Sequence, residues 1–189
     1  MAAPGVKSVR DRLLDAAAQV AVAGQWHDAR MADLATVAGV SRQTLYNEFG
    51  SKDGLVQALA LREADRLLQG AVATVADRSV TDPAAAVAAA VGWALAEAAG
   101  NPLVKAALVD DAGDLLPMLT TRSGAVVLAL RDGLVAALTA RWPELDEGES
   151  RWVAELAVRL GVSHLVVPTE ATQTTVAHVE TVVRRLLTV

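Results

Sequence analysis

Residues 34–55 read LATVAGVSRQTLYNEFGSKDGL, and their pattern predicts the fold of the N-terminal part of the chain. Apolar residues at helical spacing stand on both sides of Gly39, which indicates two short helices joined by a tight turn. Gly39 suits the end of the first helix, because the chain leaves it in a left-handed conformation that disfavours a Cβ atom. Ser41 suits the N-cap of the second helix, which Gly50 closes. This is the helix-turn-helix pattern, whose second helix enters the DNA major groove.

The same helical periodicity continues on both sides of this stretch and predicts an all-α fold. Asp82-Pro83 and Asn101-Pro102 open helices, while Pro143 and Pro168 follow helix ends. The expected helices, about nine in number, cover residues 9–22, 31–38, 42–49, 51–76, 83–99, 102–109, 121–142, 147–167 and 172–187. We expect a three-helix DNA-binding domain over residues 1–54 and a helical ligand-binding and dimerisation domain over residues 55–189. The helix from about residue 51 links the two.

Composition and charge narrow the function classes. The chain is 53% hydrophobic but only 3% aromatic, which favours closely packed helices. It contains no cysteine, which excludes disulfides, zinc fingers and thiol catalysis and fits a reducing compartment. The net charge of −5 is uneven: residues 1–52 hold six basic and five acidic side chains, and the rest holds eleven and seventeen. The less acidic end is therefore the candidate DNA-binding end, although its charge also fits an average protein surface.

The helix over residues 42–49 has two different faces. Leu45 and Phe49 stand one turn apart and face inward. The outward residues are Arg42, Gln43, Thr44, Tyr46 and Asn47. An amide can pair bidentately with adenine, Thr can meet a thymine methyl group, and Arg can reach guanine or phosphate. Tyr46 and Lys52 suit phosphate contacts. The competing interpretation is an ordinary solvated helix face, which also selects polar residues.

Three stretches carry a resemblance to a known family: LLDAA at residues 13–17, LATVAGVS at 34–41 and TLYNEFGSKDGL at 44–55. Over residues 10–55 the sequence resembles the N-terminal domain of the TetR family of transcriptional regulators. The resemblance implies an all-helical homodimer that binds a palindromic DNA operator. It also implies repression that is relieved when a small-molecule effector binds the C-terminal domain.

The sequence departs from the family pattern at two places. Before the helix at residue 31 the family often has a Ser or Thr cap, and this chain has Arg30, so we expect Asp28 to supply the cap. Arg30 and Thr36 complete the expected set of DNA-contacting side chains. Position 47, often aromatic in the family, is Asn, and we expect Glu48 to point partly inward, since an exposed carboxylate would repel phosphate.

The C-terminal helices suggest a dimer face and a pocket. Apolar stripes occur on the helices over residues 147–167 and 172–187, and they can close a four-helix interface or be buried within one subunit. The expected dimer face comprises Val153, Leu156, Leu160, His164, Val176, Val179, Val183 and Leu186. Trp93, Met118 and Trp142 fall in segments that would surround a central cavity, as pocket or as core residues.

Other functions find little support in the sequence. His27, His164 and His178 lack metal-ligand spacing, and there is no phosphate-binding Gly loop or nucleophile elbow. We therefore expect neither catalysis, nor a cofactor, nor a metal. Charges or Gly interrupt every apolar block, and the N-terminus lacks an export signal, so we expect a cytoplasmic protein without a membrane span. The alternative to a DNA-binding regulator is a dimeric helical adaptor or sensor without sequence-specific DNA binding.

Overall fold

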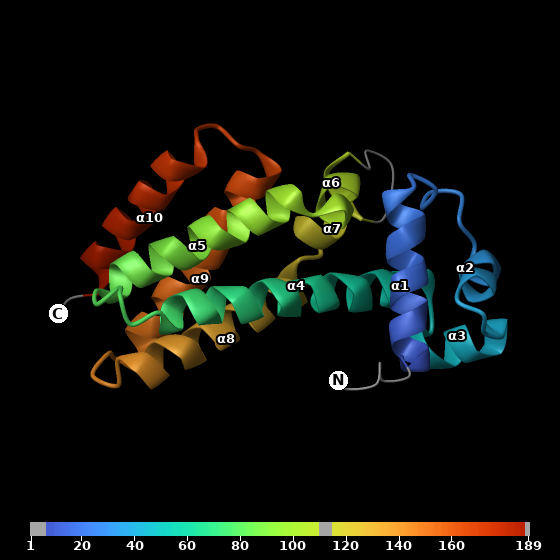
Figure 1. Ribbon diagram of the computed structural model, residues 1–189, viewed down its shortest axis with the longest axis horizontal. Helices are drawn as coiled ribbons and strands as arrows, with labels where there is room; N and C mark the ends of the chain where they lie inside the picture. The colour runs from blue at the N-terminus through green and yellow to red at the C-terminus, as the bar shows by residue number, and fades with distance from the viewer. Residues whose placement is uncertain (1–6, 110–114, 188–189) are drawn as a thin grey trace, which may run out of the picture. The chain divides into compact units, whose positions relative to one another are not determined.

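The computed structural model describes residues 7–109 and 115–187, and all regular structure in these ranges is helical (Figure 1). The ten helices there are α1 (Val9–Val22), α2 (Met31–Val37), α3 (Arg42–Phe49), α4 (Lys52–Ala76), α5 (Pro83–Gly100), α6 (Pro102–Leu108), α7 (Leu116–Leu119), α8 (Gly124–Arg141), α9 (Glu147–Val166) and α10 (Thr172–Leu186). The predicted all-α class is confirmed. The additional helix is α7, a single turn that was not predicted. α8 begins at Gly124, whereas the corresponding helix was expected to begin at residue 121.

Local capping explains the helix boundaries. Side-chain oxygens of Ser8, Ser41 and Ser51 accept backbone N–H groups at the starts of α1, α3 and α4, each at 3.0 Å. Asp82 and Asp146 cap α5 and α9 in the same way, at 3.1 and 3.0 Å. Each bond satisfies a backbone donor that the helix itself cannot pair.

The cap of α2 differs from the prediction. The Asp33 carboxylate accepts the backbone N–H of Arg30 at 3.0 Å, and the Arg30 carbonyl accepts the N–H of Asp33 at the same distance. Asp28 was therefore the wrong residue. Asp33 lies inside the first turn of α2, where a carboxylate can reach back to the N-cap amide.

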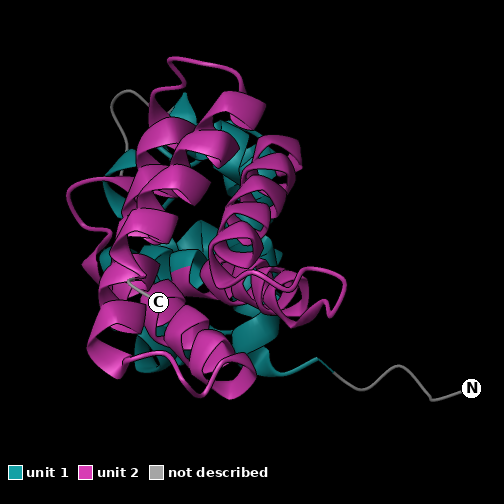
Figure 2. Cartoon of the chain, turned by 90° about the vertical axis from the view of Figure 1, so that its left-hand side faces the viewer, with its two compact units in different colours: residues 1–60, 102–118 teal, residues 61–101, 119–189 magenta. Residues whose placement is uncertain are grey.

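The chain divides into two compact units (Figure 2). Unit 1 comprises residues 1–60 and 102–118, and unit 2 comprises residues 61–101 and 119–189. In unit 1, α1 packs against α2 and α6, and α2 packs against α3. Gly39 and Gly50 have φ values of +66° and +71° at the ends of α2 and α3, as expected for the two turns. The expected division after residue 54 remains a prediction about function.

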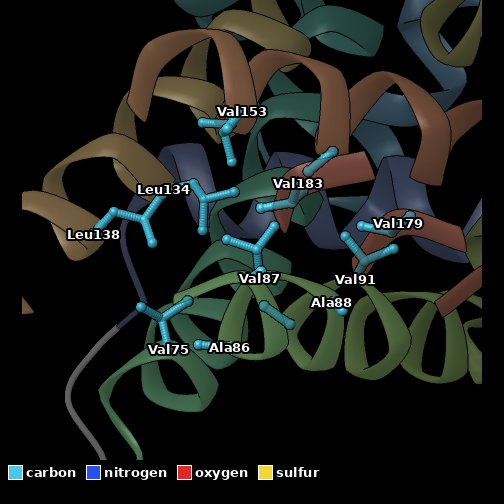
Figure 3. Close-up of a cluster of buried hydrophobic side chains, with 14 of the residues drawn as sticks. Val75, Ala86, Val87, Ala88, Val91, Leu134, Leu138, Val153, Val179 and Val183 are labelled. Atoms are coloured by element: carbon cyan, nitrogen blue, oxygen red, sulfur yellow. The ribbon is translucent and has the colours of Figure 1, made fainter. Parts of the chain in front are cut away.

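Unit 2 is built around an aliphatic core. α5 packs against α9 and α10, and α8 packs against α9. Figure 3 shows the centre of this core, where Val87 and Val91 of α5 lie among Leu134, Val153 and Val183 from the other helices. Small residues on α5 let the neighbouring helices approach closely. The core is thus made mainly of Ala, Val and Leu, as the composition indicates.

Charged side chains connect the helices of unit 2. Arg141, at the end of α8, donates to the carbonyl oxygens of Val75, Asp77 and Val80. Arg131 of α8 lies 3.4 Å from Glu155 of α9, and Arg184 of α10 pairs with Asp82 before α5. These contacts join segments far apart in the sequence.

Two segments are long and apolar enough to cross a membrane by length and composition alone: Pro83–Gly100 and Leu116–Arg141, with mean hydropathies of 1.3 and 1.5. Gly or charged residues interrupt both segments, as expected: Gly92 and Glu97 lie in the first, and Arg122 and Arg131 lie in the second. Length and composition are weak grounds for a membrane span, since the core helix of a soluble protein has the same character. α5 fits that description because its Ala and Val side chains are buried against α9 and α10.

Candidate nucleic-acid interface and apolar pocket

The outward face of α3 is the candidate nucleic-acid interface. Leu45 is fully buried and holds α3 in unit 1, whereas Arg42, Gln43 and Asn47 are exposed. Thr44 and Tyr46 are partly exposed beside them. The five predicted outward residues therefore share one accessible side of the helix, as their spacing requires.

All five of these side chains contact a neighbour on α3 or at its N-cap. Gln43 Nε2 donates to Asn47 Oδ1 over 2.8 Å, and the Arg42 guanidinium lies 5.3 Å from the centre of the Tyr46 ring. The Thr44 hydroxyl lies 2.8 Å from the hydroxyl of Ser41, so it takes part in the cap. The face is therefore partly ordered before any ligand arrives.

The Glu48 side chain is 37% exposed and its carboxylate faces α1, which agrees with the partly inward orientation expected of it. Its Oε2 lies 3.7 Å from Arg10 Nη1 on α1, and the Arg10 guanidinium stacks 4.8 Å from the centre of the Phe49 ring. The carboxylate is thus paired with a cation. Sequence reasoning missed Arg10, because no local pattern connects residues so far apart in the chain.

Lys52 has a contact that its sequence position did not indicate. Its Nζ donates to the carbonyl oxygen of Trp26 over 2.8 Å and lies 4.9 Å from the centre of the Trp26 ring. Trp26 is almost fully buried in the connection between α1 and α2. Lys52 therefore links the connection between α1 and α2 to the start of α4. The expected contact of Lys52 with phosphate remains a prediction.

The remaining expected DNA contacts lie on α2. Arg30 is exposed at the N-cap, where its backbone carries the capping bonds. Thr36 is also exposed, and its hydroxyl donates to the carbonyl oxygen of Ala32 over 3.0 Å. Both side chains are accessible to a phosphate backbone.

Unit 2 contains an apolar pocket with a cavity volume of about 100 Å³. Fifteen residues from α4, α5, α8 and α9 line it, and every one is Leu, Val, Ala or Gly. None of the three expected pocket residues lines this cavity, so their part in a ligand site stays a prediction. Trp93 packs on Gly70, Met118 belongs to unit 1, and Trp142 is a core residue beside a different, more polar cleft.

The expected dimer face divides into two groups. Val153, Val179 and Val183 are at most 1% exposed within their own subunit, so they belong to its core and can bury no further area in an interface. Leu156, His164 and Val176 are partly exposed. Leu160 and Leu186 are 36% and 42% exposed. Trp152, which was not predicted, is 75% exposed on α9.

His164 belongs to a polar cluster at the connection between α9 and α10. Its Nδ1 lies 2.9 Å from the Thr175 hydroxyl, which donates to Glu170 over 3.0 Å. His178 Nδ1 lies 3.1 Å from the same Glu170 oxygen. No group of three or more His, Cys, Asp or Glu side chains arranged to hold a metal occurs within residues 7–109 and 115–187.

Comparisons with known proteins identify the family. Residues 13–59 match the family described as bacterial regulatory proteins, tetR family, and residues 82–185 match the bacterial tetracyclin repressor C-terminal domain. The HTH-type transcriptional regulator AlkX of Mycobacterium tuberculosis is 36% identical over 164 residues, which cover 86% of this chain and 77% of that protein.

Solved structures show the same fold. The TetR family repressor AlkX from a Dietzia species, implicated in biodegradation of n-alkanes, has a TM-score of 0.79, 28% identity and 97% coverage of both chains. The multidrug binding protein EbrR, complexed with imidazole, has a TM-score of 0.64 with 22% identity and 97% coverage of both chains. The chain therefore belongs to the TetR family of bacterial regulatory proteins and is a DNA-binding transcriptional regulator.

Proposed function

We propose that this chain is a dimeric repressor that binds a palindromic operator through α3 and releases it when a small apolar molecule enters unit 2. The observation that carries the first half is the outward face of α3, where Arg42, Gln43 and Asn47 stand exposed around the buried Leu45. The exposed carboxylate of Glu48 is paired with Arg10. A regulator of this kind acts on chromosomal DNA, so we place it in the cytoplasm.

The test of DNA reading is selection of preferred sequences from genomic fragments, followed by fluorescence anisotropy on the recovered site at two salt concentrations. Asn47→Ala should lower the affinity by about 1 to 3 kcal/mol and relax the preference at one base pair. Arg30→Ala, which removes an exposed cation, should weaken all sequences alike and flatten the salt dependence. Weak binding without sequence preference would contradict the proposal and favour the adaptor alternative.

The pocket lining supports an apolar effector. No polar side chain lines the cavity, so a charged or strongly hydrogen-bonding ligand would leave polar groups unpaired there. A cavity of about 150 Å³ can hold benzene, so one of about 100 Å³ has room for a short aliphatic segment. The similarity to a repressor implicated in biodegradation of n-alkanes supports an aliphatic ligand.

Thermal unfolding in the presence of 1-butanol, 1-hexanol and 1-octanol, with imidazole as the polar comparison, tests the ligand class. Each added methylene group that enters the pocket should strengthen binding by about 0.8 kcal/mol. Stabilisation by imidazole but not by the longer alcohols would contradict an aliphatic ligand.

We place the dimer contact on the exposed stripe of α9. Trp152, Leu156 and Leu160 recur every four residues and are at least partly exposed, on a side of the helix next to the one that carries the buried Val153 and Ala157. Two DNA-binding units at the spacing of operator half-sites require such a dimer. Trp152→Arg should produce monomers in light-scattering chromatography, and an unchanged dimer would show that another surface forms the interface.

A further inference from the structure

Two amide side chains on the exposed face of α3 are hydrogen-bonded to each other. Gln43 Nε2 donates to Asn47 Oδ1 over 2.8 Å, and both residues are exposed to solvent. Residues four apart lie one turn above each other on the same side of a helix, so the bond forms without distorting α3. We propose that Gln43 is a positioning residue that orients the Asn47 amide to read one adenine in the major groove. This inference rests on the proposed reading of DNA by α3.

The chemistry of the pair points to adenine. The bond from Gln43 occupies one lone pair of Asn47 Oδ1 and leaves the second lone pair and both Nδ2 protons for a ligand. Adenine presents the N7 acceptor and the N6 amino donor in the major groove, which match Nδ2 and Oδ1. Guanine presents O6 in place of the amino group, so it would set an acceptor against Oδ1. The fixed amide therefore favours adenine over guanine.

Gln43 maintains this arrangement because the alternative orientation is unfavourable. A half-turn of the Asn47 amide alone would place its Nδ2 donor against the Nε2 donor of Gln43. The neighbouring outward side chains do not compete for the Asn47 amide, since Thr44 contacts Ser41 and Arg42 stacks on Tyr46. Ordering the side chain before DNA binds also lowers the entropy lost on binding.

The experiment compares the affinities of the recovered operator and of operators carrying single adenine-to-guanine changes. The variants are Gln43→Ala, Gln43→Glu, Asn47→Ala and the two double substitutions, with Gln19→Ala on α1 as a control for loss of an exposed Gln. In the wild type one adenine should be preferred over guanine by roughly 5- to 150-fold. Replacing that adenine by 7-deazaadenine, which lacks N7, should weaken the wild type but not Asn47→Ala.

Gln43→Ala should lower the preference for adenine at the same base pair as Asn47→Ala. Gln43→Glu should lower it further, because the introduced carboxylate only accepts hydrogen bonds and turns the Asn47 Nδ2 toward itself. In the Asn47→Ala background, neither Gln43 substitution should lower the preference for adenine any further. Gln19→Ala should leave the preference of the wild type unchanged. If the Gln43 substitutions had equal effects in the wild type and in Asn47→Ala, or acted at a different base pair, the positioning role of Gln43 would be overturned. The proposed function would then still stand. A wild type without any preferred sequence would overturn the proposed function as well.

Discussion

Nη1 of Arg10 on α1 lies 3.7 Å from Oε2 of Glu48 on α3, so the acidic side chain of α3 is paired with a cation from another helix. Both side chains remain accessible, at 50% and 37% exposure. In the proposed binding of DNA by α3, this contact neutralises a carboxylate that would otherwise repel phosphate.

Arg10→Ala should therefore weaken operator binding by roughly three- to fivefold at low salt, as an exposed ion pair contributes up to about 1 kcal/mol. Fluorescence anisotropy measures the change. Adding Glu48→Gln should restore most of the affinity in the Arg10→Ala protein. It should not do so in an Arg12→Ala protein, which loses an exposed cation that pairs with no carboxylate within residues 7–109 and 115–187. An equal rescue in both proteins would show that only net charge matters.

Gly39→Ala should destabilise unit 1 by about 1 to 2 kcal/mol, because an L residue at φ +66° is strained. A Cβ atom at Gly39 would meet no heavy atom within 4 Å, so the loss is one of backbone conformation. Gly100 also has open space but no positive φ, which makes Gly100→Ala the matched control. Denaturant unfolding should show no comparable loss for Gly100→Ala, and equal losses would refute the backbone explanation.

Gly70→Ala should destabilise unit 2 by about 1 to 3 kcal/mol through overpacking. A Cβ atom at Gly70 would lie within 3.0 Å of three atoms of the Trp93 ring, which is rigid and must move as a whole. Trp93→Leu should recover part of the loss when both substitutions are present. Additive destabilisation in the double variant, measured by denaturant unfolding, would contradict the proposed close approach.

Ala94→Leu should abolish the response to aliphatic ligands while leaving operator binding intact in the absence of ligand. Ala94 lines the apolar cavity of about 100 Å³, and three further carbon atoms would occupy part of that space. Thermal shift with 1-octanol and anisotropy on the operator measure the two properties. Ala96→Leu, on the same helix but outside the lining, is the control. Retained ligand stabilisation in Ala94→Leu would place the ligand elsewhere.

Acid should weaken the contact between α8 and α9. Hydrogen bonds from Arg159, and then from Arg131, hold the pKa of Glu155 below its ordinary value. A pKa lowered by folding stabilises the protein above the unfolded value, and this stabilisation is lost as the pH falls through the folded value. The melting temperature should therefore fall less below pH ~4 in Glu155→Gln than in the wild type. Parallel curves would exclude Glu155 as a source of the acid sensitivity.

Several features of this protein follow from short stretches of sequence alone. The helix-turn-helix, its Gly39 turn, the Ser41 cap and the outward set on α3 were all predictable, because helix periodicity and capping act within a few residues. The resemblance over residues 10–55 also sufficed to identify the family, which the matches at residues 13–59 and 82–185 confirm.

Only the tertiary structure decided which apolar stripes form the core and which remain exposed. Val153 and Trp152 are neighbours in the sequence, yet one is fully buried and the other is 75% exposed. The aliphatic lining of the pocket and the pairs Arg10–Glu48 and Lys52–Trp26 were likewise decided at this level. Sequence periodicity predicts which residues share a face of a helix, but not which other helices that face contacts. Burial and ion pairing depend on the packing of segments that are distant in the sequence, and this packing depends on the sequence of the whole chain.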